Sequence, residues 1–182
     1  CYTVFIIIGF LGVNMDSKNL TLLTDFYELT MMNGYLRHGR KDEVAVFDVF
    51  FRQNGIITYS LACGLDQVID YVLNLHFDEE DIRYLESLNS FDKEFLDYLK
   101  NFSFSGDIYA VPEGTMVFPG EPILTVKAPV MEAQLVETAI LNIVNFETLI
   151  ASKAAKVCYA AKGDAVMEFG LRRAQAPDAG IY

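Results

Sequence analysis

The longest regular pattern in this chain is helical and runs from Met131 to Ala161. Apolar and small side chains recur there at three- and four-residue spacing, which is typical of a helix with one buried face. Because roughly thirty residues is long for a helix in a globular domain, we expect it to break once, near Asn145. Residues 165–169 then have the character of a short strand, and residues 170–180 that of a polar loop.

Residues 106–126 differ from this helical region, because short apolar runs alternate there with turn-forming residues. The turn formers are Pro112, Gly114, Pro119, Gly120 and Pro122. This spacing predicts a compact layer of short strands. Pro129 closes the layer, so we place a domain boundary near Ala128–Pro129. The expected domains are therefore an N-terminal α/β domain over residues 15–129 and the beginning of a second domain over residues 130–182.

The segment before this layer is expected to hold helices and strands in alternation. A first helix begins at Thr24 or Asp25, either of which can cap it, and Gly39 ends it. Residues 43–52 are rich in β-branched and aromatic side chains, which predicts a buried strand. A turn then leads to a second strand over residues 57–62. Apolar periodicity predicts three more helices, with their apolar stripes packed in the core, in residues 64–75, 78–88 and 91–102.

Composition excludes several classes of protein. The 182 residues are 52% hydrophobic and 21% charged, which is ordinary for a folded domain and excludes a disordered chain. The net charge of -11 disfavours nucleic acid or an anionic membrane surface as a partner. Cysteines stand only at positions 1, 63 and 158, which supports neither a disulfide framework nor a zinc site. A reduced, cytoplasmic setting fits best, with Cys63 and Cys158 as small buried residues.

Residues 1–14 are apolar but too short to span a bilayer, and they lack the basic start and cleavage site of a secretory signal. Met15 follows at once and is succeeded by an ordinary polar start. We therefore expect residues 1–14 to be a non-native leader, with Met15 as the initiator. Intact mass measurement of the mature protein tests this expectation.

The chemistry of the chain is concentrated in the loop after residues 165–169. Two adjacent guanidinium groups, Arg172 and Arg173, stand there with an amide and an acid between glycines. The carboxyl ends of strands are where α/β barrels build their sites. Arginine binds phosphate through paired hydrogen bonds that lysine cannot reproduce. In a chain this acidic, the loop is a candidate anion-binding site.

Four segments in order along residues 20–182 together resemble the nicotinate phosphoribosyltransferase family. The first two are Leu23-Thr-Asp-Phe-Tyr-Glu-Leu-Thr-Met-Met32 and Phe47-Asp-Val-Phe-Phe-Arg52. The other two are Val111-Pro-Glu-Gly-Thr-Met-Val-Phe-Pro-Gly-Glu-Pro122 and Glu168-Phe-Gly-Leu-Arg-Arg-Ala-Gln-Ala-Pro-Asp-Ala-Gly180. Any one of them can arise by chance, but four in sequence are highly specific.

This resemblance implies the formation of nicotinate mononucleotide and pyrophosphate from nicotinate and phosphoribosyl pyrophosphate. It also implies coupled ATP hydrolysis with Mg2+, hence a ligase-type classification, and a role in NAD salvage. The implied fold is an α/β sandwich followed by an irregular type II phosphoribosyltransferase β/α barrel, of which this chain would contain only the start. The implied assembly is a cytoplasmic homodimer with active sites shared between subunits.

The resemblance assigns roles to single residues. Tyr27 matches a tyrosine that reaches the nicotinate site from the partner subunit. Phe169 matches a position against the pyridine ring, and Arg172 one that contacts phosphate, with Arg173 beside it. Asp178 is expected either to contact ribose hydroxyls or Mg2+ or to shape the loop. An aromatic face and a cation suit a planar pyridine carboxylate.

The sequence also departs from the family pattern. Ala176 stands where the family loop usually has glycine, so a close backbone approach there is altered. The phosphorylated histidine of the family is expected beyond Tyr182, since neither His38 nor His76 fits its motif. We therefore expect the 182-residue chain to be inactive by itself.

Two alternatives remain open at this point. A nicotinamide-using relative belongs to the same class of enzyme, and the Arg-Arg-Ala-Gln sequence at residues 172–175 argues against it only modestly. The second alternative is that the chain is a noncatalytic binding fragment or a small β carrier module. A carrier would require a modifiable lysine at a hairpin tip, whereas Lys127 lies at the end of a strand beside Pro129.

Overall fold

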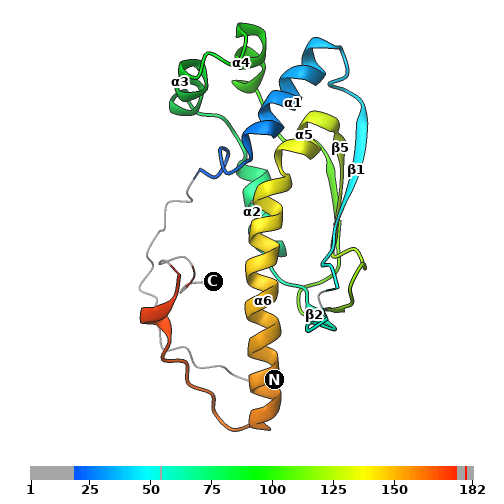
Figure 1. Cartoon of the computed structure of the whole chain (residues 1–182), viewed down its shortest axis with the longest axis vertical. Helices are drawn as coiled ribbons and strands as arrows, with labels where there is room; N and C mark the ends of the chain where they lie inside the picture. The colour runs from blue at the N-terminus through cyan, green and yellow to red at the C-terminus, as the bar shows by residue number, and fades with distance from the viewer. Residues whose placement is uncertain (1–18, 54, 176–178, 180–182) are drawn as a thin grey trace.

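The computed structural model describes residues 19–53, 55–175 and 179 and contains a three-stranded antiparallel sheet (Figure 1). Strand β5 (Leu124–Pro129) lies in the centre, between β1 (Val44–Val49) and β3 (Asp107–Ala110). Phe47 and Ile108 both lie opposite Val126. A second, two-stranded sheet pairs β2 (Ser60–Leu61) with β4 (Met116–Val117). The short strands expected in residues 106–126 are thus confirmed.

One face of the three-stranded sheet packs on the core and the other is open. In β5 the side chains of Leu124, Val126 and Ala128 are buried, whereas Lys127 between them is exposed. The expectation that residues 43–52 form a buried strand is wrong. Val44 is 63% exposed and Val46 58% exposed, because both lie on the open face of an edge strand. Antiparallel sheets commonly keep one face in water, and a run of apolar letters does not reveal this.

Four helices precede or flank the sheet. They are α1 (Phe26–Arg37), α2 (Leu65–Asn74), α3 (Glu79–Ser87) and α4 (Lys93–Leu99). Each lies within a predicted helical segment. The described helices include none long and apolar enough to cross a membrane.

Helix α1 ends as expected but begins differently. It stops at Arg37, and Gly39 follows with a left-handed φ of +67°. Asp25 occupies the capping position, yet its side chain accepts no hydrogen bond from the first amides. The hydroxyl of Thr24 donates to the Glu28 carboxylate instead of capping the helix. Neither of the two proposed caps therefore works through its side chain.

The long helical region breaks at Val136 and not at Asn145. Helix α5 (Val130–Leu135) packs against β5, β1 and α1, whereas α6 (Glu137–Ala161) packs against β2 and α2. The chain must change direction between these two surfaces, which places the break near the start of the region. Asn145 lies exposed inside an unbroken helix of 25 residues.

Residues 165–169 do not form the expected strand. No described strand lies beside them, so their backbone has no sheet partner. After α6 the chain turns back and places a single 3-10 turn, η1 (Leu171–Arg173), to one side of that helix (Figure 1). A parallel strand in a barrel needs neighbouring strands, and the described residues supply none here.

Helix α4 offers a test of local stability. The Asp92 carboxylate accepts the amide hydrogen of Phe95 at 3.0 Å, and Arg37 of α1 donates to it at 2.6 Å. Removing an aspartate cap costs about 1 kcal/mol. We expect Asp92→Ala to lower the free energy of unfolding by that amount in urea titrations. Glu94→Ala, at an exposed acidic residue of the same first turn, should cost less.

The same carboxylate predicts a dependence on pH. The Phe95 amide, and then Arg37, hold the pKa of Asp92 below its ordinary value. Since the folded pKa lies below the unfolded value of about 3.9, the stabilisation is present above that pH. It is lost as the pH falls through the folded pKa. The stability difference between wild type and Asp92→Ala should therefore shrink below about pH 4. An unchanged difference at pH 3 contradicts this assignment.

Candidate functional site

Tyr27 lies on the outer side of α1, where a set of apolar side chains is open to solvent. Its side chain is 47% exposed, next to Phe26 at 51% and Met31 at 40%. The nearby charge of Glu137, at the start of α6, raises the pKa of the Tyr27 phenol, and partial burial, Glu28 and Asp25 add to this effect. Tyr27 is therefore an accessible aromatic group in acidic surroundings.

Phe169, Arg172 and Arg173 are also open to solvent. Phe169 is 74% exposed, and both arginines of η1 are exposed. The turn is closed by the Arg173 amide, which donates to the Gly170 carbonyl at 2.7 Å. Within the part of the chain that the structure describes, neither guanidinium group forms an ion pair. The loop thus presents one aromatic ring and two available cations on a short segment, while Asp178 lies outside the described residues.

The structure brings Phe169 and the two arginines onto one loop but keeps Tyr27 apart from them. In Figure 1, α1 lies at the N-terminal end of α6, whereas Leu171–Arg173 lies apart from it, to the side of the middle of that helix. One copy of this chain therefore does not bring Tyr27 together with Phe169 and the two arginines in one pocket.

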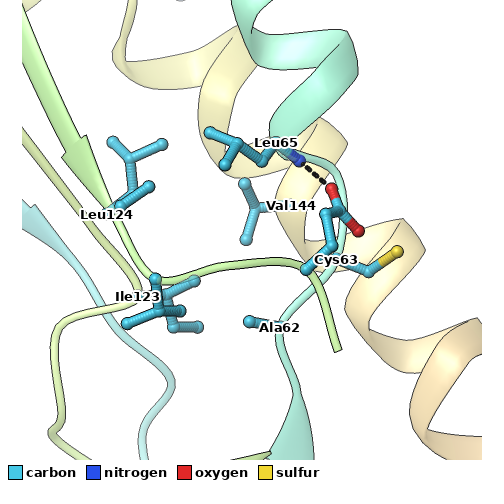
Figure 2. Close-up of a pocket in the computed structure, with 9 residues that line it drawn as sticks. Ala62, Cys63, Leu65, Ile123, Leu124 and Val144 are labelled. Atoms are coloured by element: carbon cyan, nitrogen blue, oxygen red, sulfur yellow. Dashed lines mark hydrogen bonds between the residues drawn. The ribbon is translucent and has the colours of Figure 1, made fainter. Parts of the chain in front are cut away.

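A different cluster, which sequence reasoning missed, surrounds the start of α2 (Figure 2). The Glu113 carboxylate accepts the amide hydrogens of Gly64 at 3.0 Å and Leu65 at 2.6 Å, and so caps this helix from a turn forty-eight residues away. The cavity beside it has a volume of about 10 Å³. That is scarcely room for one water, so the cavity is not a substrate pocket. In the sequence, the only sign of a role for Glu113 is its place in the turn Pro112-Glu-Gly114.

Cys63 borders this cavity and is half-buried, as is Cys158, so the expectation of two buried cysteines is wrong. The thiol lies 3.8 Å from a carboxylate oxygen of Glu147. Burial, and then the neighbouring Glu113 and Glu147 carboxylates, raise the pKa of Cys63 to about 12. Carboxylates on two sides and partial burial both disfavour a thiolate.

We expect Cys63 to resist alkylation in the folded protein. At pH 8 a thiol with this pKa is almost entirely protonated, and the thiolate is the reactive form. Iodoacetamide labelling followed by peptide mass spectrometry should modify Cys63 only at the rate of unfolding. Addition of urea should expose it, and Cys63→Ser identifies the peptide. Rapid labelling in buffer alone contradicts the assignment.

The described residues contain no group of three histidine, cysteine or acidic side chains that could hold a metal ion. His38 and His76 are exposed, and their Nδ1 atoms lie 2.8 Å and 2.6 Å from backbone carbonyls. Both histidines were expected to be surface residues on helices; they are on the surface, but His38 follows the end of α1 and His76 follows the end of α2.

Known proteins match this chain in sequence and in structure. Residues 22–145 match the family model of the nicotinate phosphoribosyltransferase (NAPRTase) N-terminal domain. A nicotinate phosphoribosyltransferase of Mycobacterium tuberculosis is 46% identical over 159 residues, which cover 87% of this chain and 34% of that protein. The Bacillus subtilis nicotinate phosphoribosyltransferase is 42% identical over 176 residues, covering 94% of this chain and 35% of that protein.

A solved structure agrees with these sequences. Human nicotinic acid phosphoribosyltransferase is 36% identical and superimposes with a TM-score of 0.78, covering 87% of this chain and 32% of that one. The chain therefore spans about a third of the length of the relatives it matches. The shared segments include the α1 sequence with Tyr27 and the turn with Glu113. On the family model, the relatives and the mixed α/β fold together, this chain belongs to the nicotinate phosphoribosyltransferase family.

Proposed function

We propose that the complete polypeptide to which this chain belongs is a nicotinate phosphoribosyltransferase in NAD salvage. It joins nicotinate to the ribosyl group of phosphoribosyl pyrophosphate, forming nicotinate mononucleotide and releasing pyrophosphate. The observation that carries this proposal is family membership together with the exposed segment from Phe169 to Arg173. An accessible ring followed by two guanidinium groups that form no ion pair with the described residues suits an aromatic carboxylate and a phosphorylated sugar.

The family resemblance implies the roles of this loop in the proposal, and the chemistry of its side chains is consistent with them. Phe169 packs against the flat face of the pyridine ring. Arg172 donates paired hydrogen bonds to phosphate, and Arg173 adds a second positive charge close to the leaving pyrophosphate. Positive groups fixed where negative charge develops lower the barrier to such a transfer. Asp178 contacts the ribose hydroxyls or Mg2+ in this proposal.

Tyr27 completes the site of a partner subunit in this proposal. The separation of α1 from the segment Leu171–Arg173 in Figure 1 supports a contribution across a homodimer interface. The exposed apolar side chains of Leu23, Phe26 and Met31 around it are of the kind that subunit contacts cover. A second copy of the chain would bring Tyr27 to the pyridine ring held by Phe169.

ATP and Mg2+ remain part of the proposal on family grounds. His38 and His76 do not fit the phosphorylated-histidine motif of the family, and the described residues contain no group of three histidine, cysteine or acidic side chains that could hold a metal ion. We propose, on the family resemblance, that the phosphorylated histidine and the rest of the β/α barrel lie after Tyr182. The 182-residue chain alone is then inactive, and the complete protein acts in the cytoplasm.

The decisive experiment supplies the complete polypeptide with nicotinate, phosphoribosyl pyrophosphate, ATP and Mg2+. Mass spectrometry should detect nicotinate mononucleotide, and the same assay with nicotinamide or quinolinate should yield no product. Product from nicotinamide in place of nicotinate overturns the substrate assignment. A folded dimer that neither binds nicotinate nor forms product favours a noncatalytic role.

A further inference from the structure

Glu28 is a buried acid that no cation neutralises among the residues that the structure describes. Its side chain is completely inaccessible, at 0% exposure, on the inner side of α1. One carboxylate oxygen accepts a hydrogen bond from the Thr24 hydroxyl, and the other accepts one from Thr138 at 2.9 Å. An acid buried in this way costs free energy unless its hydrogen bonds are specific and well placed. Hydrophobic packing alone does not require an acid at this position.

The hydrogen bonds of Glu28 link two helices that are distant in sequence. Thr24 precedes α1, whereas Thr138 lies in the first turn of α6, 110 residues after Glu28. Burial, opposed by these two hydroxyls, raises the pKa of Glu28 above its ordinary value. Burial, and then the charge of Glu28, also raise the pKa of the Tyr71 phenol on α2. The hydrogen bond to Thr138 places the acid between the first turn of α1 and the first turn of α6.

Tyr27 lies directly beside this junction. It is the residue before Glu28, and Glu137, the residue before Thr138, is the largest influence on its phenol. The hydrogen bond from Thr138 to Glu28 thus joins the residue that follows Glu137 to the residue that follows Tyr27. Movement of the first turn of α1 away from the start of α6 would break this bond and displace the tyrosine.

We propose that Glu28 is a positioning residue, whose hydrogen bonds with Thr24 and Thr138 fix the first turn of α1 on α6 and thereby aim Tyr27 at the nicotinate site. This inference rests on the proposed function, in which Tyr27 contacts nicotinate. Glu28 itself is too deeply buried to touch substrate. Its effect must reach the reaction through the placement of its neighbour.

The test uses the complete polypeptide and compares five substitutions, one of which is Tyr27→Ala. Glu28→Ala removes both hydrogen bonds, and Thr138→Val removes one without changing the shape of the side chain. Glu28→Gln should retain function, because the amide oxygen of glutamine accepts a hydrogen bond from one hydroxyl while its amide nitrogen donates one to the other. Thr125→Val is the matched control, since it removes a hydroxyl bond to Asp48 on the distant open sheet face.

We expect Glu28→Ala and Thr138→Val to raise the KM for nicotinate roughly tenfold or more, because small displacements of positioning groups have effects of this size. The KM for phosphoribosyl pyrophosphate should stay within about twofold, since its phosphates contact the arginine loop in this proposal. Glu28→Gln should stay within about threefold of wild type for both substrates. If Glu28→Ala does not fold, Thr138→Val carries the comparison.

Three outcomes overturn the inference. The first is an equal rise in both KM values, and the second is a lower unfolding midpoint with unchanged kinetics; each indicates a structural role alone. The third is that Tyr27→Ala leaves the KM for nicotinate unchanged, which also removes the proposed role of Tyr27. If Tyr27→Ala raises that KM while Thr138→Val does not, the proposed function stands and only the positioning role of Glu28 fails.

Discussion

Arg172→Ala should lower kcat/KM of the complete polypeptide by about a hundredfold to a thousandfold while leaving its stability unchanged. The loss is large because a guanidinium group aimed at phosphate stabilises charge that grows during the transfer. Stability should not change, because Arg172 is exposed and forms no ion pair among the described residues. Substitutions at such positions usually stay within about 0.5 kcal/mol.

Steady-state kinetics with both substrates, together with urea unfolding, measures this separation. Arg172→Lys keeps the charge but loses the paired geometry, so its activity should fall between wild type and Arg172→Ala. Arg83→Ala is the matched control, because Arg83 is an exposed arginine on α3, 3.9 Å from Glu80 and outside the proposed site. Wild-type activity in Arg172→Ala removes this residue from the phosphate site.

The second large effect concerns the core. Phe95→Ala should lower the free energy of unfolding by about 3–5 kcal/mol, the usual cost of removing a buried aromatic ring. Phe95 has 0% exposure on α4, and its ring centroid lies 5.3 Å from that of Phe91. Phe91 in turn lies 5.7 Å from Phe26 of α1. The substitution therefore leaves a cavity and loosens the contact between α4 and α1.

Urea unfolding followed by circular dichroism measures this loss, and the transition midpoint should fall without a large change in slope. Phe169→Ala is a matched control, since it removes the same ring from a side chain that is 74% exposed. It should leave stability within about 0.5 kcal/mol of wild type. A loss below about 1 kcal/mol in Phe95→Ala means that the site collapses around the missing ring.

Local patterns predicted most of the helices. The acidic start at Asp78 is a capping box in the structure, where its side chain accepts from the Glu80 and Asp81 amides. Helix α2 lies one residue inside each end of its predicted segment. Such features depend on residues within one or two turns of each other, so the sequence contains the information they need.

The errors share a different cause. The apolar sequence around Val44 and Val46 predicts that both are buried. They are exposed, because no described element covers that face of the sheet. The long helical region breaks at Val136, and not near Asn145 as expected, because α5 and α6 pack on different surfaces. Residues 165–169 lack a neighbouring strand in the described structure. In each case the deciding partner is remote in sequence.

The same distinction between local sequence patterns and contacts remote in sequence applies to the candidate site. The sequence by itself determined the family and the candidate residues Tyr27, Phe169 and Arg172, because motifs record residue types in order. Only the tertiary structure separated Tyr27 from the arginine loop and linked Glu28 to Thr138 across 110 residues. Hydrogen bonds and burial depend on atoms brought together by folding, and a buried glutamate looks in sequence like any exposed one.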